Sequence, residues 1–262
     1  MTTASLTYRA PFAPGQPQAI DPETCGKLLS VALSRGGDYA DLYFEYRAAA
    51  SMLFEEGITR SASRGVSLGL GVRVQRGDAT GYAYVEDLSF EAMKRAAETA
   101  ARIAESGGGV APATLERMTL PERYDLDKLS IDVSGLEKRA LLERASRAAL
   151  AHDKRIVKAD ASFAEEVREI LVATSDGRFA HDVQPLMRFG VSAIAEQGDK
   201  RESGRSGGGG RMTLGYFDDM SAGRAAGGRV KKNLTLLDAP PAPPPSITPP
   251  GPIEDFNVAL RS

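Results

Sequence analysis

Hydrophobic and polar residues alternate along the stretch from residue 38 to residue 87. Apolar side chains occupy every second position from Ala40 to Tyr46 and again from Val66 to Val74. Because neighbouring side chains of a strand point to opposite faces, this period of two predicts a sheet with one buried face. Turn residues divide the stretch into an antiparallel meander, with strands expected at about 40–48, 51–56, 58–63, 66–75 and 79–85.

Three segments carry the start signals of helices. Asp21-Pro22-Glu23 supplies an N-cap, a first-turn proline and an acid, and Gly36-Gly37 ends the apolar stripe that follows. Ser89 caps a second helix that runs to about Glu105. Ser134 and Glu137 form a capping box, in which each side chain satisfies a free backbone N–H, and open a third helix to about His152.

The second half of the chain repeats the order of the first. After the third helix, alternation predicts strands to about 163, at 167–174, 178–184 and 186–197, with a hairpin turn at Asp176-Gly177. Gly177 matches Gly57, and Gln197-Gly198-Asp199 matches Arg76-Gly77-Asp78. An internal repeat explains the match, and so does chance, because turn residues recur often. We expect an α+β fold with antiparallel sheets, packed helices and two related helix-plus-sheet units.

Changes in composition suggest the domain boundaries. We expect an N-terminal arm at 1–19, one domain at 20–230 with possible sub-units at 20–109 and 134–200, and a linker at 110–133. Residues 201–211 are rich in Gly and Arg and read as a flexible loop. Residues 231–262 form a proline-rich tail, which excludes a helix or a central strand.

Composition excludes several classes of protein. The 262 residues are 42% hydrophobic and 26% charged with a net charge of -2, so nothing favours nucleic acid or an anionic membrane. A single cysteine, Cys25, cannot form an internal disulfide. No apolar run approaches the roughly 18 residues of a membrane span, and no secretory h-region opens the chain. The expected location is the cytoplasm.

Four sequence blocks resemble one protein family. They read ADLYFEYR, EEGITRSASRGVSLGLGVRV, GDATGYAYVEDLS and VKADASFAEEVREILVATSDG. These blocks are similar to the N-terminal domain of the TldD/PmbA family, the TldD branch in particular, over residues 20–240. The resemblance implies a zinc metallopeptidase of two related subunits that acts on unstructured peptides in an enclosed cavity. It places the zinc in a C-terminal domain, on a His-Glu-x-x-x-His helix and a downstream cysteine.

The chain departs from that zinc signature. Its only histidines, His152 and His181, are each followed by Asp, so no catalytic, cofactor or metal residue carries over. We expect the chain alone to be inactive, as the N-terminal portion of a longer product or as a truncated or frame-disrupted one. The expected partner is a related subunit or a second copy. The alternative is a non-catalytic interaction module that pairs with or regulates a related subunit.

The histidines, the cysteine and three arginines each have a catalytic or binding interpretation and a structural one. His152-Asp153 and His181-Asp182 are either bases with an orienting carboxylate or ordinary surface or structural histidines. Cys25 is a nucleophile or a buried structural residue. Arg201, Arg205 and Arg211 offer guanidinium groups to phosphates or belong to a mobile loop, so a nucleic-acid partner is not expected.

Two residue sets remain in the first sheet. One set consists of glycines that alternate within strands and open no helix, which favours close packing or sheet twist over a phosphate cradle. The other set is the polar face of the first strand, which is either solvated or forms a subunit interface or the wall of a peptide-holding cavity. The glycines are Gly65, Gly69, Gly71 and Gly81, and the polar-face residues are Asp41, Tyr43, Glu45 and Arg47.

Overall fold

The computed structural model describes residues 9–105, 111–121, 129–211 and 213–217, which form an α+β fold. The proline-rich tail and the domain end expected near residue 230 lie outside these residues. The helices are α1 (Pro22–Leu33), α2 (Phe90–Ile103) and α3 (Gly135–Leu150), with short 3-10 turns η1 (Ser130–Asp132) and η2 (Leu214–Phe217). The strands are β1 (Tyr39–Glu55), β2 (Ile58–Arg76), β3 (Ala79–Val85), β4 (Glu116–Met118), β5 (Ile156–Thr174), β6 (Arg178–Gln197) and β7 (Lys200–Gly210).

All seven strands belong to one sheet. Its order is β3-β2-β1-β5-β6, with β7 beside one end of β6 and β4 beside the other. Neighbouring strands are antiparallel, except that β4 lies parallel to β6. β4 belongs to the segment that the sequence predicted to be a linker. A helix followed by three antiparallel strands occurs twice, as α1-β1-β2-β3 and α3-β5-β6-β7, and the two units join where β1 pairs with β5. This topology confirms the expected pair of helix-plus-sheet units.

The long strands are continuous where the sequence suggested breaks. Ala49 of β1 pairs with Gly65 of β2 on one side and with Glu166 of β5 on the other. Backbone hydrogen bonds to both neighbours hold this part of β1 extended, so the expected interruption near residue 50 is wrong. β6 also passes unbroken through Pro185, which lies between the part of β6 that pairs with β4 and the part that pairs with β7.

The helix starts lie where the sequence places them. Asp21 accepts a hydrogen bond from Thr24 N at 2.8 Å, and this bond lowers the pKa of its carboxyl. At α3, Ser134 Oγ accepts from Glu137 N at 3.2 Å as expected. The Glu137 carboxylate instead accepts from the Ser134 hydroxyl at 3.0 Å, so the second bond of the capping box differs from the prediction.

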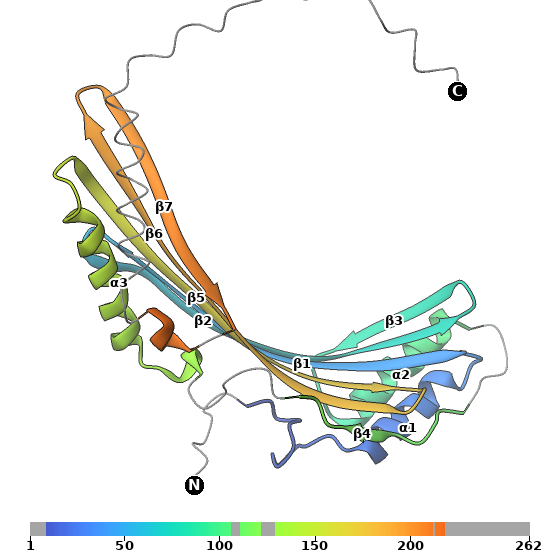
Figure 1. Ribbon diagram of the computed structural model, residues 1–262. Coiled ribbons are helices and arrows are strands. Elements are labelled where there is room, and N and C mark those ends of the chain that lie inside the picture. Colours follow the sequence, from blue (N-terminus) through green and yellow to red (C-terminus); the bar gives the residue numbers. More distant parts are fainter. Residues whose placement is uncertain (1–8, 106–110, 122–128, 212, 218–262) are drawn as a thin grey trace, which may run out of the picture.

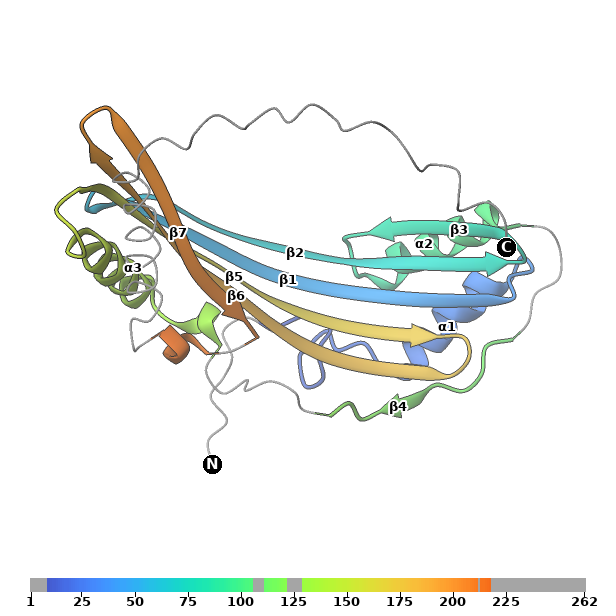
Figure 2. The ribbon, with the colours of Figure 1, turned by 45° about the horizontal axis from the view of Figure 1, so that its top comes forward.

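The three helices of the described ranges cover one face of the sheet, and no described helix packs on the other. Even-numbered β1 residues and odd-numbered β5 residues are buried beneath them along both strands. α1 and α2 cover one end, where the ring centroids of Phe12, in the N-terminal arm, and Phe44 lie 5.8 Å apart. α3 covers the other end, over Phe163 and Phe189. Figure 1 shows the sheet bent so that both ends rise away from the helices, and Figure 2 shows the strands running between the two helical ends.

Candidate functional site: the open face of the sheet

The bare side of the sheet, called the open face below, is the candidate site. It carries the odd-numbered residues of β1 and the even-numbered residues of β5 and β6, together with their register partners on β2, β3 and β7. The polar-face candidates of the first strand, Asp41, Tyr43, Glu45 and Arg47, all lie here. The bend of the sheet makes this face concave (Figure 1).

Ion pairs cross the middle of the open face from strand to strand. Arg47 of β1 lies 2.6 Å from the Glu166 carboxylate of β5, and Arg168 lies 3.2 Å from the same carboxylate. Tyr43 donates to Glu45 at 2.8 Å, and the pKa of Tyr43 rises to about 12 through partial burial and this carboxylate. These contacts pair most of the polar groups with one another, although the buried Arg168 Nε has no hydrogen-bond partner in the described ranges and lies 3.6 Å from Glu45.

Tyrosines lie over glycines at the α1 and α2 end of the open face. A Cβ atom at Gly69 would stand 2.4 Å from the Tyr84 hydroxyl, and one at Gly71 would stand 2.7 Å from the Tyr82 hydroxyl. Both rings therefore rest on β2 where the glycines leave room. On the covered face, a Cβ at Gly81 would stand 2.0 Å from Ala100 O of α2. Close packing is confirmed for these three glycines, whereas a Cβ at Gly65 would meet nothing.

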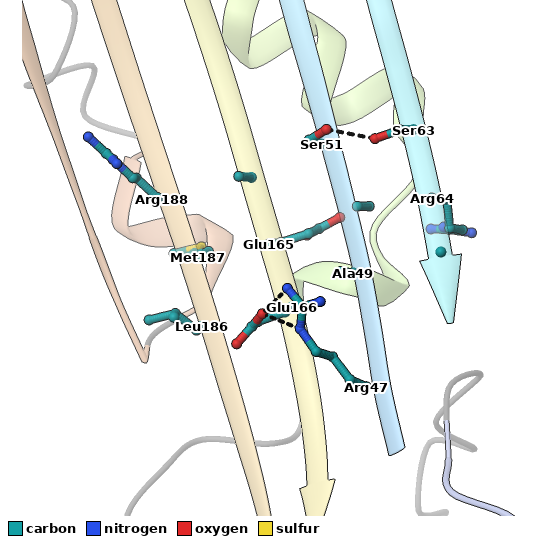
Figure 3. Close-up of a pocket in the computed structure, with 13 residues that line it drawn as sticks. Arg47, Ala49, Ser51, Ser63, Arg64, Glu165, Glu166, Leu186, Met187 and Arg188 are labelled. Carbon is teal, nitrogen blue, oxygen red and sulfur yellow. Dashed lines mark hydrogen bonds and ion pairs between the residues drawn. The ribbon is translucent and has the colours of Figure 1, made fainter. Parts of the chain in front are cut away.

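A hollow of about 500 Å³ opens where β1, β2, β5 and β6 lie side by side. Small residues form much of its lining, and Figure 3 shows Ser51 and Ser63 bonded across it at 2.7 Å and the Arg47–Glu166 pair at its edge. Leu186 adds an exposed apolar side chain. The hollow offers backbone, hydroxyl and apolar surface to a ligand that lies flat on the sheet.

A buried ion pair supports the strands beneath this hollow. Lys138 Nζ of α3 lies 2.5 Å from Glu165 Oε1 of β5, with the two side chains 5% and 1% exposed. Glu165 Oε2 has no hydrogen-bond partner in the described part of the chain. The pair holds α3 against β5, and no pattern in the sequence predicts it.

Neither histidine forms a hydrogen bond with the aspartate that follows it. Asp153 binds Arg155, which lowers the pKa of its carboxyl to about 2, and exposed His152 follows the end of α3. Asp182 accepts from Gln184 at 2.8 Å, whereas His181 Nε2 lies 2.9 Å from Glu169 on the covered face. His152 is thus a surface residue, and His181 is held by the buried Glu169 carboxylate and not by Asp182.

Cys25 is the buried structural residue that the helix pattern favoured. Its side chain is buried within α1, and burial followed by the charge of Asp21 raises the pKa of its thiol to about 12. A thiol with this pKa is not a nucleophile at neutral pH.

The Arg/Gly-rich segment is a strand and not the expected mobile loop. Residues 200–210 form β7 and pair with β6 from Gln197 back to Met187. A Cβ at Gly207 would stand 2.3 Å from Phe189 O, and one at Gly209 would stand 2.2 Å from Met187 O. The glycines therefore allow β7 to approach β6 closely, a role that composition does not distinguish from flexibility. Arg201 pairs with Glu196 at 3.4 Å, and Arg205 is exposed on the open face.

The described residues carry neither a metal-site nor a membrane-span signature. The described ranges hold no group of three or more His, Cys, Asp or Glu side chains placed to bind a metal ion. No helix within them combines the length and apolar character that a bilayer span needs.

Comparisons with known proteins agree on one family. The family model for the PmbA/TldA metallopeptidase domain 1 matches residues 40–104, and the model for the central domain of the same metallopeptidases matches residues 128–234. The Metalloprotease TldD homolog of Haemophilus influenzae is 31% identical over 87% of this chain and 48% of its own length. That of Buchnera aphidicola is 35% identical over 74% of this chain and 41% of its own length. The chain thus spans about half the length of the curated relatives that it matches.

Solved structures show the same fold. A proposed modulator of DNA gyrase from Thermotoga maritima superimposes with a TM-score of 0.63 at 16% identity, covering 80% of this chain and 47% of that one. TldE from Thermococcus kodakarensis gives a TM-score of 0.58 at 15% identity, covering 74% and 44%.

Proposed function

The chain belongs to the PmbA/TldD metallopeptidase family, and from this we propose that it is the non-catalytic N-terminal portion of a TldD-like zinc metallopeptidase subunit. In this role, its open face is a wall against which unstructured peptide substrates lie. The matches to domain 1 and the central domain, and to about half of the curated relatives' length, support the assignment to this portion.

The observation that carries the proposal is the one-sided covering of a long sheet. The three helices of the described residues pack on the same face, and the concave opposite face has a hollow whose lining comes from four strands and includes many small residues. An extended chain can follow such a trough along the strands. Extended peptides bind sheets through backbone groups and through pockets for alternate side chains.

The described residues do not fit a zinc site. Zinc in a peptidase takes three protein ligands and leaves one position for water. His181 is engaged by Glu169, while exposed His152 follows the end of α3, and neither belongs to a three-residue donor group in the described ranges. We therefore assign no step of hydrolysis to these residues and propose that they hold and position the polypeptide.

A related subunit is the proposed partner. This chain resembles TldD homologs in sequence and TldE in fold. That double likeness supports pairing between two chains of this kind. Retention of a TldE-type subunit by the immobilised chain tests the pairing, and elution of that subunit with the unbound fraction contradicts it. Elution of the subunit would also contradict the alternative, an interaction module whose only role is to bind that subunit.

Peptide binding tests the wall itself. The probe is a fluorescein-labelled peptide of about 20 residues rich in Gly, Ser and Asn, which stays unstructured. Its anisotropy is expected to rise with added chain in a saturable way. Ala164 lies exposed in the hollow and Ala140 lies exposed on α3, so the same substitution to Gln can be made on each side of the sheet.

The two alanine variants have opposite expected results. Ala164→Gln places a long side chain in the hollow and is expected to weaken binding several-fold, while Ala140→Gln leaves binding unchanged. Absence of binding by the unaltered chain, or equal losses in both variants, contradicts the proposal.

A further inference from the structure

Two arginines on the open face differ from the others there. Arg47, Arg73 and Arg168 each lie within ion-pair distance of a carboxylate on a neighbouring strand. Arg188 of β6 and Arg205 of β7 are exposed on the same face, and neither guanidinium has an ion pair or hydrogen bond to another described residue. Figure 3 shows Arg188 reaching outward from β6 with no dashed line to it.

Both arginines line one hollow of about 370 Å³ at the α3 end of the face. Its floor is formed partly by Gly190, whose register partners are Ser162 of β5 and Gly207 of β7. Two of these three residues have no side chain, so the floor lies low between the two long arginine side chains. Gly190 therefore shapes the hollow by leaving its floor without a side chain.

The lining of this hollow contains hydroxyls and cations but no carboxylate. Its hydroxyl groups belong to serines on four strands, which can donate to an anion. The nearest acid in register is Asp160, which pairs with Ser192 and is itself held 3.8 Å from Lys158. The serines are Ser51, Ser61, Ser162 and Ser192.

Arg188 also connects this hollow to its neighbours. It lines the 500 Å³ hollow on one side and a hollow of about 600 Å³ along β7 on the other. The three hollows therefore form a trough across β1, β5, β6 and β7 with Arg188 in the middle. A trough of this extent exceeds a single phosphate or acetate ion and suits a chain that carries its anionic groups on side chains.

We propose that Arg188 and Arg205 bind the carboxylates of acidic residues in an extended polypeptide lying on the open face. A guanidinium matches a carboxylate with two parallel N–H donors, which makes arginine the fitting residue for this contact. The inference rests on the proposed function, because it assumes that polypeptide lies on this face, and it adds a preference for acidic sequence.

The test compares two labelled peptides that differ only in charge. One carries Asp at several positions of the unstructured probe and the other carries Asn at the same positions. At low ionic strength of about 50 mM, where exposed charges are weakly screened, the Asp peptide is expected to bind about five- to tenfold more tightly. Raising the salt to about 0.5 M is expected to remove most of this preference.

Matched double variants assign the preference to these residues. Arg188→Gln with Arg205→Gln is expected to bring the affinity ratio of the two peptides close to one. Arg139→Gln with Arg144→Gln makes the same change in net charge on the exposed side of α3 and is expected to leave the ratio unchanged.

Four outcomes would overturn the inference. Equal affinity for the two peptides, or a preference that survives loss of both open-face arginines, refutes the acidic preference and leaves the peptide wall standing. Tighter binding of a single-stranded oligonucleotide than of the Asp peptide would assign the arginines to phosphates instead. Absence of binding by either peptide would refute the proposed function as well.

Discussion

The Glu169 carboxylate on β5 lies 3.0 Å from the guanidinium of Arg9 in the N-terminal arm. The same carboxylate accepts from Ala10 N at 2.7 Å and lies 2.9 Å from His181 Nε2. Its side chain is 1% exposed, so three donors surround a charge that is removed from water. This group fixes the arm to the covered face of the sheet, next to the site where Phe12 packs on Phe44.

Glu169→Gln is expected to lower the free energy of unfolding by about 2–4 kcal/mol, because hydrogen bonds to a buried charge are lost. Burial raises the pKa of Glu169, but the bonds from His181 and Ala10 and the charge of Arg9 outweigh it, and the net pKa is lowered. A lowered pKa gives stability that is present above the ordinary carboxyl pKa of 4.5 and is lost as the pH falls through the folded-state value.

Urea unfolding between pH 7 and pH 3 measures this effect. The unaltered chain is expected to lose more stability in acid than the Glu169→Gln variant does. Glu116→Gln, on the exposed edge strand β4, serves as control and is expected to change neither stability nor its pH dependence. Parallel pH profiles for all three chains would contradict the role of Glu169.

Gly207→Ala is expected to detach β7, because the new Cβ would stand 2.3 Å from Phe189 O, a backbone atom that cannot move alone. Gly208→Ala is the matched control, since its Cβ meets nothing within 4 Å. Amide hydrogen exchange of residues 200–210 is expected to speed up in the first variant only. Fast exchange of this segment in the unaltered chain would show that it is a loop after all.

Lys138→Met is expected to destabilise the chain by about 3–5 kcal/mol, because it leaves the Glu165 charge buried and unpaired. Adding Glu165→Leu removes that charge and is expected to restore most of the lost stability. Thermal unfolding of the two single variants and the double variant measures the coupling. Additive losses would mean that the two side chains do not act as a pair.

Cys25 is expected to resist thiol reagents in the folded chain, because burial raises the pKa of its thiol to about 12. Its reaction with Ellman's reagent at pH 8 should proceed only as fast as the protein opens. The same chain in denaturing urea should react at once. Equal rates in both conditions would place the thiol at the surface.

The alternation of side chains was enough to predict the sheet and its buried face. Ala40, Leu42 and Phe44 are buried as the period of two requires, and the turns at Gly57 and Gly177 form the two hairpins. At the first of these turns, Glu56 and Gly57 have φ of 52° and 81°, the backbone geometry that such tight turns favour. Local chemistry decides these features, so local sequence reveals them.

Features that depend on contacts between distant segments could not be predicted. The many glycines of β7 predict a flexible loop. In the structure these glycines allow β7 to approach β6 closely, which the sequence of β7 alone does not reveal. The Lys138–Glu165 pair joins a helix to a strand 27 positions away. The contrast between Arg188 or Arg205 and the paired arginines of the open face depends on carboxylates supplied by neighbouring strands, which the local sequence does not reveal.

Photo-crosslinking tests whether a bound polypeptide lies on the open face. An unstructured peptide that carries benzoylphenylalanine is irradiated with the intact chain, and mass spectrometry identifies the attached residues. Crosslinks are expected at open-face positions such as Ala49, Ala164 and Leu186. Crosslinks confined to the exposed sides of α1, α2 and α3 would contradict this placement, because the polypeptide would then lie on the helical side of the sheet.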